Sequence, residues 1–259
     1  MSEANLLHRV TWATLACGLA AAMLGLLWGA GGLYERDTPS VAGAARGADL
    51  LTLAVVAGGA WAMLRGGAAA PALLAVVHAW LLYLHAGNAL GAVAFNEAFP
   101  LYVAAMPLSA WGLALAAAGA GRLAPPRRLA AFLAASGIVT AAVWALMLWG
   151  EMAGGIAPSA PRVRTTYALD LGVIAPLCLA GAWAVSAGVP WAMRLAVPLL
   201  GLEALLLPMM AAQTVMQARA GAALGPEAAI PLLGFGVLSA FAFGFLRRML
   251  RAPHRGVPA

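Results

Sequence analysis

Hydrophobic residues form eight long runs along this chain, separated by short segments that hold most of its charges. The hydrocarbon core of a bilayer is ~30 Å thick, and a helix crosses it with about 20 apolar residues. Each run has roughly that length, so the pattern predicts eight transmembrane helices. The runs cover residues 11–30, 49–65, 71–92, 99–120, 127–150, 166–187, 191–216 and 228–246.

Composition supports the same fold class. Hydrophobic residues make up 64% of the 259 residues, charged residues 9%, and the mean hydropathy is +0.90. A soluble domain carries about 25% charged residues, so this chain has too little polar surface to cover a core in water. We therefore expect one all-α, polytopic domain over residues 1–259 that lies in the lipid bilayer as a multi-pass protein.

The fifteen basic residues are all arginines, and they lie mainly between the apolar runs. This is the distribution of topology signals and not of a groove that follows phosphates, so the net charge of +6 does not indicate a nucleic-acid partner. With the N-terminus in the cytoplasm, ten arginines fall inside and five outside, which favours cytoplasmic N- and C-termini. The ten are Arg9, Arg65, Arg122, Arg127, Arg128, Arg194, Arg247, Arg248, Arg251 and Arg255; the five are Arg36, Arg46, Arg162, Arg164 and Arg219.

An offset of 121 residues relates the two halves of the chain. Trp28 lies near the end of the first run and Trp149 near the end of the fifth, and an aspartate follows each of them by 21 residues, at Asp49 and Asp170. The same shift places the third and fourth runs near the seventh and eighth. It predicts a four-plus-four parallel repeat of residues 1–122 and 127–255 about an axis along the membrane normal, as in some transporters. Chance alignment of alanine-rich helices is the alternative interpretation.

Polar side chains within the apolar runs are costly and are candidates for a functional site. His78 and His85 share the third run and stand ~10.5 Å apart along its axis, so they need a partner helix to hold one ion. Glu203 lies near the middle of the seventh run, where its carboxyl group must be protonated or paired, and one of these histidines is the expected partner. Pro208 frees a backbone carbonyl nearby. Neutral imidazoles and a protonated carboxyl group, each hydrogen-bonded to a neighbouring helix, are the structural alternative.

The carboxylates near the outer ends of the runs have simpler explanations. Asp49 opens the second run and is predicted to be a helix N-cap, whereas Asp170 lies about one turn into its helix. Glu151 ends the fifth run, where it either pairs with Arg162 or Arg164 or joins the two aspartates in an outward-facing acidic mouth.

Several chemistries lack the residues that they need. The chain has no lysine for covalent chemistry, and it has no Walker loop and no HExxH, GxSxG or CxxC motif. Cys17 and Cys178 are interpreted as two buried structural thiols. No cofactor is predicted, and an enzyme is the less favoured class.

Four segments resemble a widespread bacterial family of uncharacterised polytopic membrane proteins. They are residues 34–39 (YERDTP), 47–53 (GADLLTL), 95–104 (FNEAFPLYVA) and 169–172 (LDLG) with the proline at 176. The resemblance extends over most of the chain and implies a multi-pass protein of the bacterial inner (plasma) membrane. It also implies that Asp49, Asn96 and Asp170 belong to the family pattern. None of these segments is a known catalytic motif, so the resemblance implies no activity.

Three functions follow from these features. The leading hypothesis is a transporter or binding protein for a small solute or ion, with Glu203 and a histidine as the proton-coupled element. The enzymatic alternative is an intramembrane metal-assisted hydrolase that uses His78, His85, Asp170 and Glu203. The third is a non-catalytic assembly subunit, because small residues permit close helix contacts and homo-oligomers; examples are Gly18, Gly25, Gly59, Gly112, Gly119 and Gly121. The expected solute site faces outward and is lined by Asp49, His85, Asn88, Asn96, Glu151, Asp170 and Glu203.

Overall fold

The computed structural model describes residues 2–28, 32–34, 37–91, 96–121, 123–153, 161–223 and 229–251. Within these ranges all regular structure is helical, and eight helices are long and apolar enough to cross a membrane. The prediction of an all-α fold with eight apolar spans is therefore confirmed for the described part of the chain.

The helices correspond one to one to the predicted runs, and their ends agree within about five residues, except that the first helix begins eight residues and the second ten residues before the predicted start. The first half of the chain forms α1 (Glu3–Leu27), α2 (Pro39–Arg65), α3 (Ala70–Gly91) and α4 (Phe99–Ala120). The second half forms α5 (Leu129–Ala153), α8 (Ala192–Arg219) and α9 (Ala229–Arg251). Between α5 and α8, the sixth run is continuous but changes its winding, as α6 (Pro161–Leu169), the π-helical segment η1 (Asp170–Ile174) and α7 (Ala175–Ser186).

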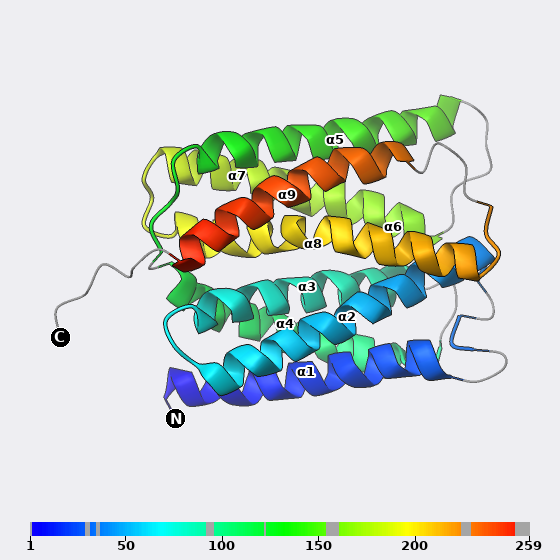
Figure 1. Ribbon diagram of the computed structural model, residues 1–259, viewed down its shortest axis with the longest axis horizontal. Helices are drawn as coiled ribbons and strands as arrows, with labels where there is room; N and C mark the ends of the chain where they lie inside the picture. Colours follow the sequence, from blue (N-terminus) through cyan, green and yellow to red (C-terminus); the bar gives the residue numbers. More distant parts are fainter. Residues whose placement is uncertain are drawn as a thin grey trace.

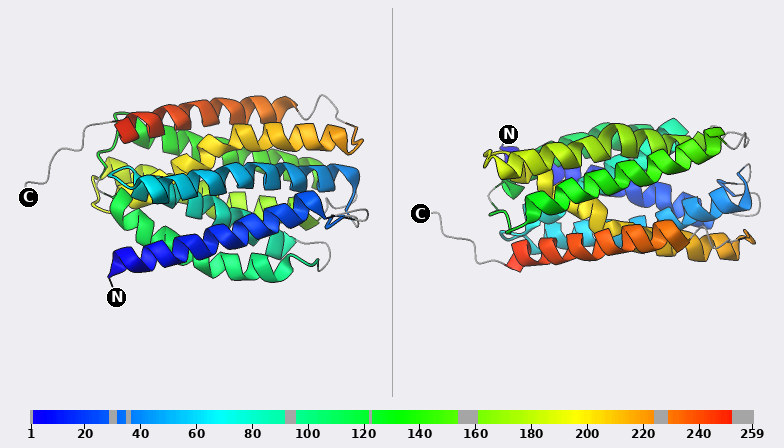
Figure 2. Two further views of the ribbon diagram at one scale, coloured as in Figure 1. Left: turned by 60° about the horizontal axis from the view of Figure 1, so that its bottom comes forward. Right: turned by 90° about the horizontal axis from the view of Figure 1, so that it is seen from above.

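The helices run side by side along the longest axis of the molecule, with their connections at the two ends (Figure 1). In that view α1–α4 form the lower part and α5–α9 the upper part, and Figure 2 shows the same lengthwise arrangement of the helices from two further sides. The first residues of α1 and the last residues of α9 lie at the same end of the bundle. Each half of the sequence thus occupies its own half of the structure.

Contacts between the two halves are made chiefly by α2 packing along α8 and by α3 packing against α8 and α6. The contact of α2 with α8 depends on Gly43 and Gly47. A Cβ atom at either position would overlap the backbone of α8, at Gln217 or at Gln213. Small residues spaced four apart let the backbones of two membrane helices touch, and this pair does so across the middle of the molecule.

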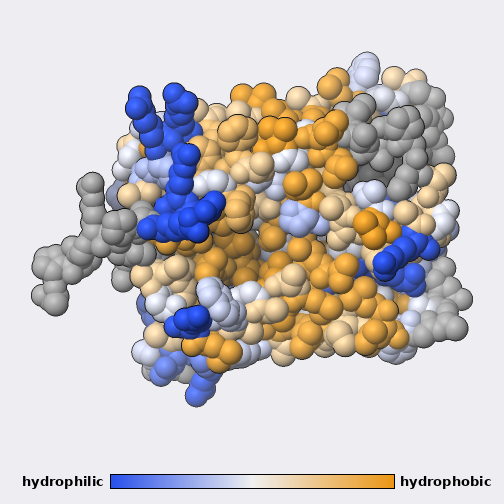
Figure 3. Space-filling view, in the orientation of Figure 1, coloured by the Kyte–Doolittle hydropathy of each residue, from blue (hydrophilic) through white to orange (hydrophobic). Residues whose placement is uncertain are grey.

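The perimeter of the bundle is strongly apolar. Leu64, Leu146 and Leu233 are each more than 70% exposed, and Figure 3 shows an apolar band between two hydrophilic ends. Trp28 and Trp149 are also exposed, at the ends of α1 and α5, where indole rings favour the membrane–water interface. An exposed apolar band of this kind is consistent with contact with a lipid bilayer.

The start of α2 differs from its prediction. The helix begins at Pro39, ten residues before the expected start, and Thr38 is its N-cap, with its side chain accepting a hydrogen bond from the Val41 N–H at 3.4 Å. Asp49 therefore lies inside the helix, and the predicted N-cap role of Asp49 is wrong. Residues 39–48 look like a loop because they are rich in glycine and alanine, yet the glycines are needed for the contact with α8.

Two further expectations about packing are confirmed. Pro208 lies inside α8, and the carbonyl of Ala204 that it leaves without a helical partner accepts a hydrogen bond from Ser239 Oγ of α9 at 2.8 Å. The small residues named above lie at close contacts, and these contacts are made within the chain. Added Cβ atoms at Gly18, Gly25, Gly59, Gly112, Gly119 and Gly121 would each meet side chains of another helix.

Candidate functional site

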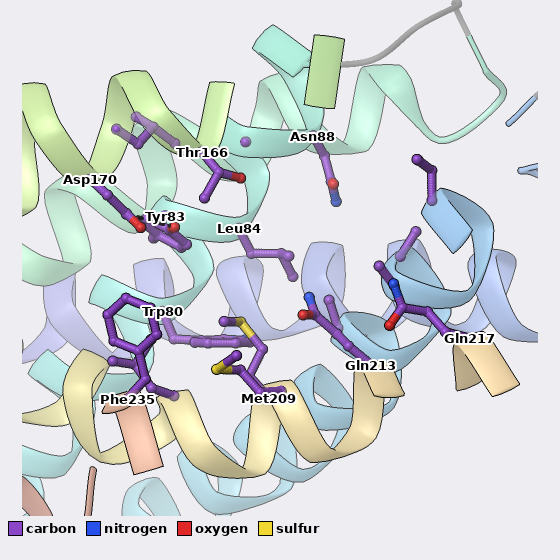
Figure 4. Close-up of a pocket in the computed structure, with 18 of the residues that line it drawn as sticks. Trp80, Tyr83, Leu84, Asn88, Thr166, Asp170, Met209, Gln213, Gln217 and Phe235 are labelled. Atoms are coloured by element: carbon purple, nitrogen blue, oxygen red, sulfur yellow. Dashed lines mark hydrogen bonds between the residues drawn. The ribbon is translucent and has the colours of Figure 1, made fainter. Parts of the chain in front are cut away.

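A pocket of about 280 Å³ lies between the two halves of the chain, among α2, α3, α6 and α8. It extends from Ser40 and Gln217, at the end of the bundle away from the chain termini, to Trp80 and Asp170 further inside. Figure 4 shows the side chains of its two walls facing each other, with Asp170, Thr166 and Asn88 opposite residues of α8. The pocket thus brings polar side chains from both halves of the chain to the same space.

The π-helical segment places Asp170 in this pocket. Asp170 is the first residue of η1, and its carbonyl accepts the Ala175 N–H five residues later. Pro176 has no N–H to continue the ordinary α-helical ladder, which favours a wider turn immediately before it. The carboxylate is buried and accepts a hydrogen bond from Tyr83 Oη of α3 at 2.8 Å. The aspartate is thereby fixed against a helix of the other half.

Amide side chains line the pocket nearer its mouth. Asn88 is buried on α3, and Gln213 and Gln217 stand one turn apart on α8. Gln217 Nε2 donates to both the carbonyl and the hydroxyl oxygen of Ser40, each at 3.1 Å, which joins the end of α8 to the beginning of α2. The mouth of the pocket is therefore lined by groups that can donate and accept hydrogen bonds.

Aromatic side chains surround the inner part of the pocket. Trp80, Tyr83, Trp144 and Phe235 all line it, and the rings of Trp144 and Phe235 lie 5.8 Å apart between centroids. The indole N–H of Trp80 donates to Thr52 Oγ1 of α2 at 3.1 Å. With its polar edge engaged in this way, the Trp80 ring contributes an apolar, π-rich surface to the site.

Beyond Asp170 a second, smaller cavity of about 30 Å³ leads to Glu203. A cavity of this size holds about one water molecule. Glu203 is only 2% exposed, and its Oε1 accepts hydrogen bonds from Ser136 Oγ and, at 3.5 Å, from Cys178 Sγ. Its Oε2 has no hydrogen-bond partner among the described atoms. The expected pairing of Glu203 with a histidine is therefore wrong, because Ser136 and Cys178 hold it instead.

Both membrane histidines lie on the other side of α3, toward α1 and α4. His78 Nε2 is 3.0 Å from Thr11 Oγ1, and its ring fills the space above Gly112, where a Cβ atom would overlap it. His85 stacks on Tyr102 of α4, with ring centroids 5.8 Å apart. Neither histidine lines the pocket, and no group of three or more metal-ligating side chains occurs in the described part of the chain. The four residues of the hydrolase hypothesis are thus not brought together.

Asp49 and Asn96 are also held elsewhere. Asp49 accepts a hydrogen bond from Tyr34 Oη at 2.7 Å and packs on Gly25, where any side chain would overlap the carboxylate. Asn96 Oδ1 accepts the Ala98 N–H at 3.1 Å in the turn before α4. Both side chains stabilise connections in the first half and do not line the pocket.

Glu151 lies near the pocket without lining it. Its Oε1 accepts a hydrogen bond from Tyr167 Oη at 2.6 Å, and the Tyr167 ring contacts that of Trp144 at 5.2 Å between centroids. Of the two expected arginine partners, Arg164 is exposed, and the side chain of Arg162 lies outside the described residues. Glu151 therefore supports the aromatic wall through Tyr167.

Of the seven expected site residues, Asn88 and Asp170 line the main pocket, and Asp170 and Glu203 share the smaller cavity. The sequence interpretation missed the aromatic wall and the glutamines of α8. Gln213 and Gln217 had a readable signal, since two amides one turn apart in an apolar helix share a face. Tyr83 had none, because an aromatic residue in an apolar run is typical of an ordinary core.

Comparisons of the chain with family models, with curated proteins and with solved structures find no match. The proposal that follows therefore depends on the geometry of the pocket.

Proposed function

We propose that this protein is a secondary transporter that binds a small polar solute in the pocket and couples its movement to protons. The observation that carries the proposal is the position of the pocket, which lies between the two halves of the chain and ends at a buried carboxylate. Transporters built from repeats place their sites at the interface of the halves and use discontinuous helices there. The π-helical segment at Asp170 is such a discontinuity.

A parallel repeat has support from two buried polar pairs. Thr11 with His78 and Ser136 with Glu203 are both separated by 67 residues, and each pair joins the first and third spans of its half. A shift of 125 residues relates the two pairs, about one helical turn more than the shift that relates Asp49 to Asp170. The contacts between the halves follow the same symmetry. The second span of the first half, α2, packs on the third span of the second half, α8. The second span of the second half begins with α6, which packs on the third span of the first half, α3.

The distribution of arginines supports cytoplasmic termini and an outward-facing pocket in a bacterial inner membrane. Among described side chains, eight arginines lie toward the end of the bundle that holds the termini and three toward the end with the pocket mouth. The eight are Arg9, Arg65, Arg127, Arg128, Arg194, Arg247, Arg248 and Arg251; the three are Arg46, Arg164 and Arg219. Arg36, Arg122 and Arg255 lie outside the described residues.

Cysteine labelling tests this orientation. In a variant without Cys17 and Cys178, an impermeant maleimide should label Ala223→Cys, beyond α8, in intact cells. It should label Ala68→Cys, in the turn before α3, only after the membrane is opened. Labelling of Ala68→Cys alone in intact cells would reverse the proposed orientation.

The route for protons follows the two cavities. Asp170 and Glu203 border the same water-sized space, and carboxyl groups within a membrane protein are the usual elements of proton relays. Glu203 holds its proton or releases it through that space, while Ser136 fixes its other oxygen. Asp170 thus borders both the solute pocket and the smaller cavity that leads to Glu203.

Transport is tested with full-length protein in liposomes that contain a pH-sensitive dye. After a pH gradient is imposed, the liposomes receive choline, glycerol or sulfate, which are a cation, a neutral solute and an anion. We expect one of these probes to change the internal pH with wild-type protein and to lose this effect with Glu203→Gln, which keeps the side-chain shape but cannot exchange a proton. Glu97→Gln, an exposed control, should behave as wild type. If no probe changes the internal pH beyond empty liposomes, the transport proposal fails.

A further inference from the structure

We infer that the solute of this pocket is a small organic ammonium cation; this inference rests on the proposed function and names its substrate class. Charge is the first reason. Asp170 is the only ionisable carboxylate, and no arginine or histidine is present, among the described residues that line the main pocket. An anion would therefore meet an uncompensated carboxylate in a largely apolar site, whereas a cation would neutralise it.

The aromatic wall is the second reason. Trp80 and Tyr83 of α3 and Phe235 of α9 lie around the inner pocket near Asp170, and Trp144 of α5 also lines the pocket. Aromatic faces attract alkylammonium groups through their quadrupoles, most strongly when water is excluded. A carboxylate with several aromatic rings around it is the combination that holds an organic cation.

The hydrogen bond of Tyr83 sharpens this assignment. The Tyr83 hydroxyl group donates to Asp170 Oδ1 and so orients the carboxylate, while the ring of the same side chain forms part of the aromatic wall. The amides of Asn88 and Gln213 lie nearer the mouth, where their oxygens can accept a hydrogen bond from a hydroxyl or amino group at the far end of the solute. The site therefore fits a molecule with a cationic head and a short polar tail.

A bare metal ion fits the pocket less well. Ca²⁺ and Mg²⁺ take six or more oxygen ligands close together, whereas the described pocket offers a single carboxylate, and its amide oxygens lie apart from that carboxylate, nearer the mouth. Its volume of about 280 Å³ also exceeds what one ion needs, and lies just below the range of roughly 300–1,000 Å³ that is typical of pockets for organic ligands.

The test compares two probes of nearly equal shape. Choline carries a quaternary nitrogen, and 3,3-dimethylbutan-1-ol has a carbon in its place and no charge. Binding of each to the purified full-length protein is measured by calorimetry in detergent. We expect choline to bind at least tenfold more tightly than the neutral alcohol. Equal affinities, or no measurable binding of either probe, would overturn the inference.

Variants show whether the preference arises in this pocket. Asp170→Asn should weaken choline binding at least tenfold and change binding of the alcohol by less than twofold. Trp144→Leu, at a half-buried position, should also reduce the ratio of the two affinities if Asp170→Asn does not fold. Glu97→Gln removes an equal charge at an exposed site and should leave both affinities unchanged.

The liposome experiment separates failure of this inference from failure of the transport proposal. Choline binding without any pH change in liposomes would leave the cation site standing and remove transport. A pH change driven by glycerol or sulfate, with no binding of choline, would keep transport and overturn the cation assignment.

Discussion

Replacing Gly47 with leucine should destabilise the contact between the two halves of the molecule. A Cβ atom at this position would meet the backbone of Ala212 and Gln213 in α8. Backbone atoms have no rotamers to change, so α2 and α8 must move apart by roughly 1 Å to restore ordinary van der Waals contact. This separation would also widen the pocket, which both helices line.

The size of the effect follows from the overlap. Inserting atoms into a well-packed contact costs about 1–3 kcal/mol of unfolding free energy. For a chain of this size each kcal/mol lowers the Tm by roughly 2–4 °C, so the expected decrease is roughly 2–12 °C. Tryptophan fluorescence of the purified protein during heating in detergent measures it.

Gly58→Leu is the matched control. Gly58 lies on the same helix, and a Cβ atom there has no neighbour within 4 Å. The leucine at that position should leave the Tm unchanged or slightly raised, since it replaces a glycine in a helix. Equal Tm values for Gly47→Leu and Gly58→Leu would refute the close contact between α2 and α8.

Two further substitutions test buried hydrogen bonds through the same melting assay. Thr11→Val removes the hydroxyl partner of His78 and should lower the unfolding free energy by about 0.5–2 kcal/mol. Thr214→Val is the control and should lower it less, because the Thr214 hydroxyl donates to the Met210 carbonyl of its own helix. Equal decreases in Tm for the two variants would show that the bond to His78 does not stabilise the fold. Ser239→Ala leaves the Ala204 carbonyl without its partner and should cost about 1 kcal/mol; an unchanged Tm would mean that lipid or water satisfies that carbonyl.

The hydrophobic pattern was sufficient to predict the helices because lipid imposes their length and composition. It failed where a segment is helical for another reason. Residues 39–48 join α2 through contacts with α8, and Gly43 and Gly47 are favourable there although glycine is a poor helix former in isolation. Local propensity could not reveal this, because the partner helix lies about 170 residues away in the sequence.

The candidate site was less predictable, and the residues show why. The sequence identifies which positions in the apolar runs are polar, but not the direction in which each side chain points. That direction has meaning only once it is known which helices pack together. His85 and Tyr83 lie two residues apart on α3, yet His85 stacks on Tyr102 of α4 while Tyr83 binds Asp170. Residues two apart on a helix point to different sides, so only tertiary packing decides which of them reaches the pocket.

The winding of residues 170–174 has a consequence for motion. A π-helical turn contains one residue more than the α-helical turn that it replaces, and one residue corresponds to a rotation of about 100° around the helix axis. If these five residues tightened to ordinary α-helix, the whole of α6, with Thr166, would swivel by that angle while α7 stayed in place. A small local rewinding would therefore turn one wall of the pocket to a new face, with a shift of only about 1.5 Å along the helix axis.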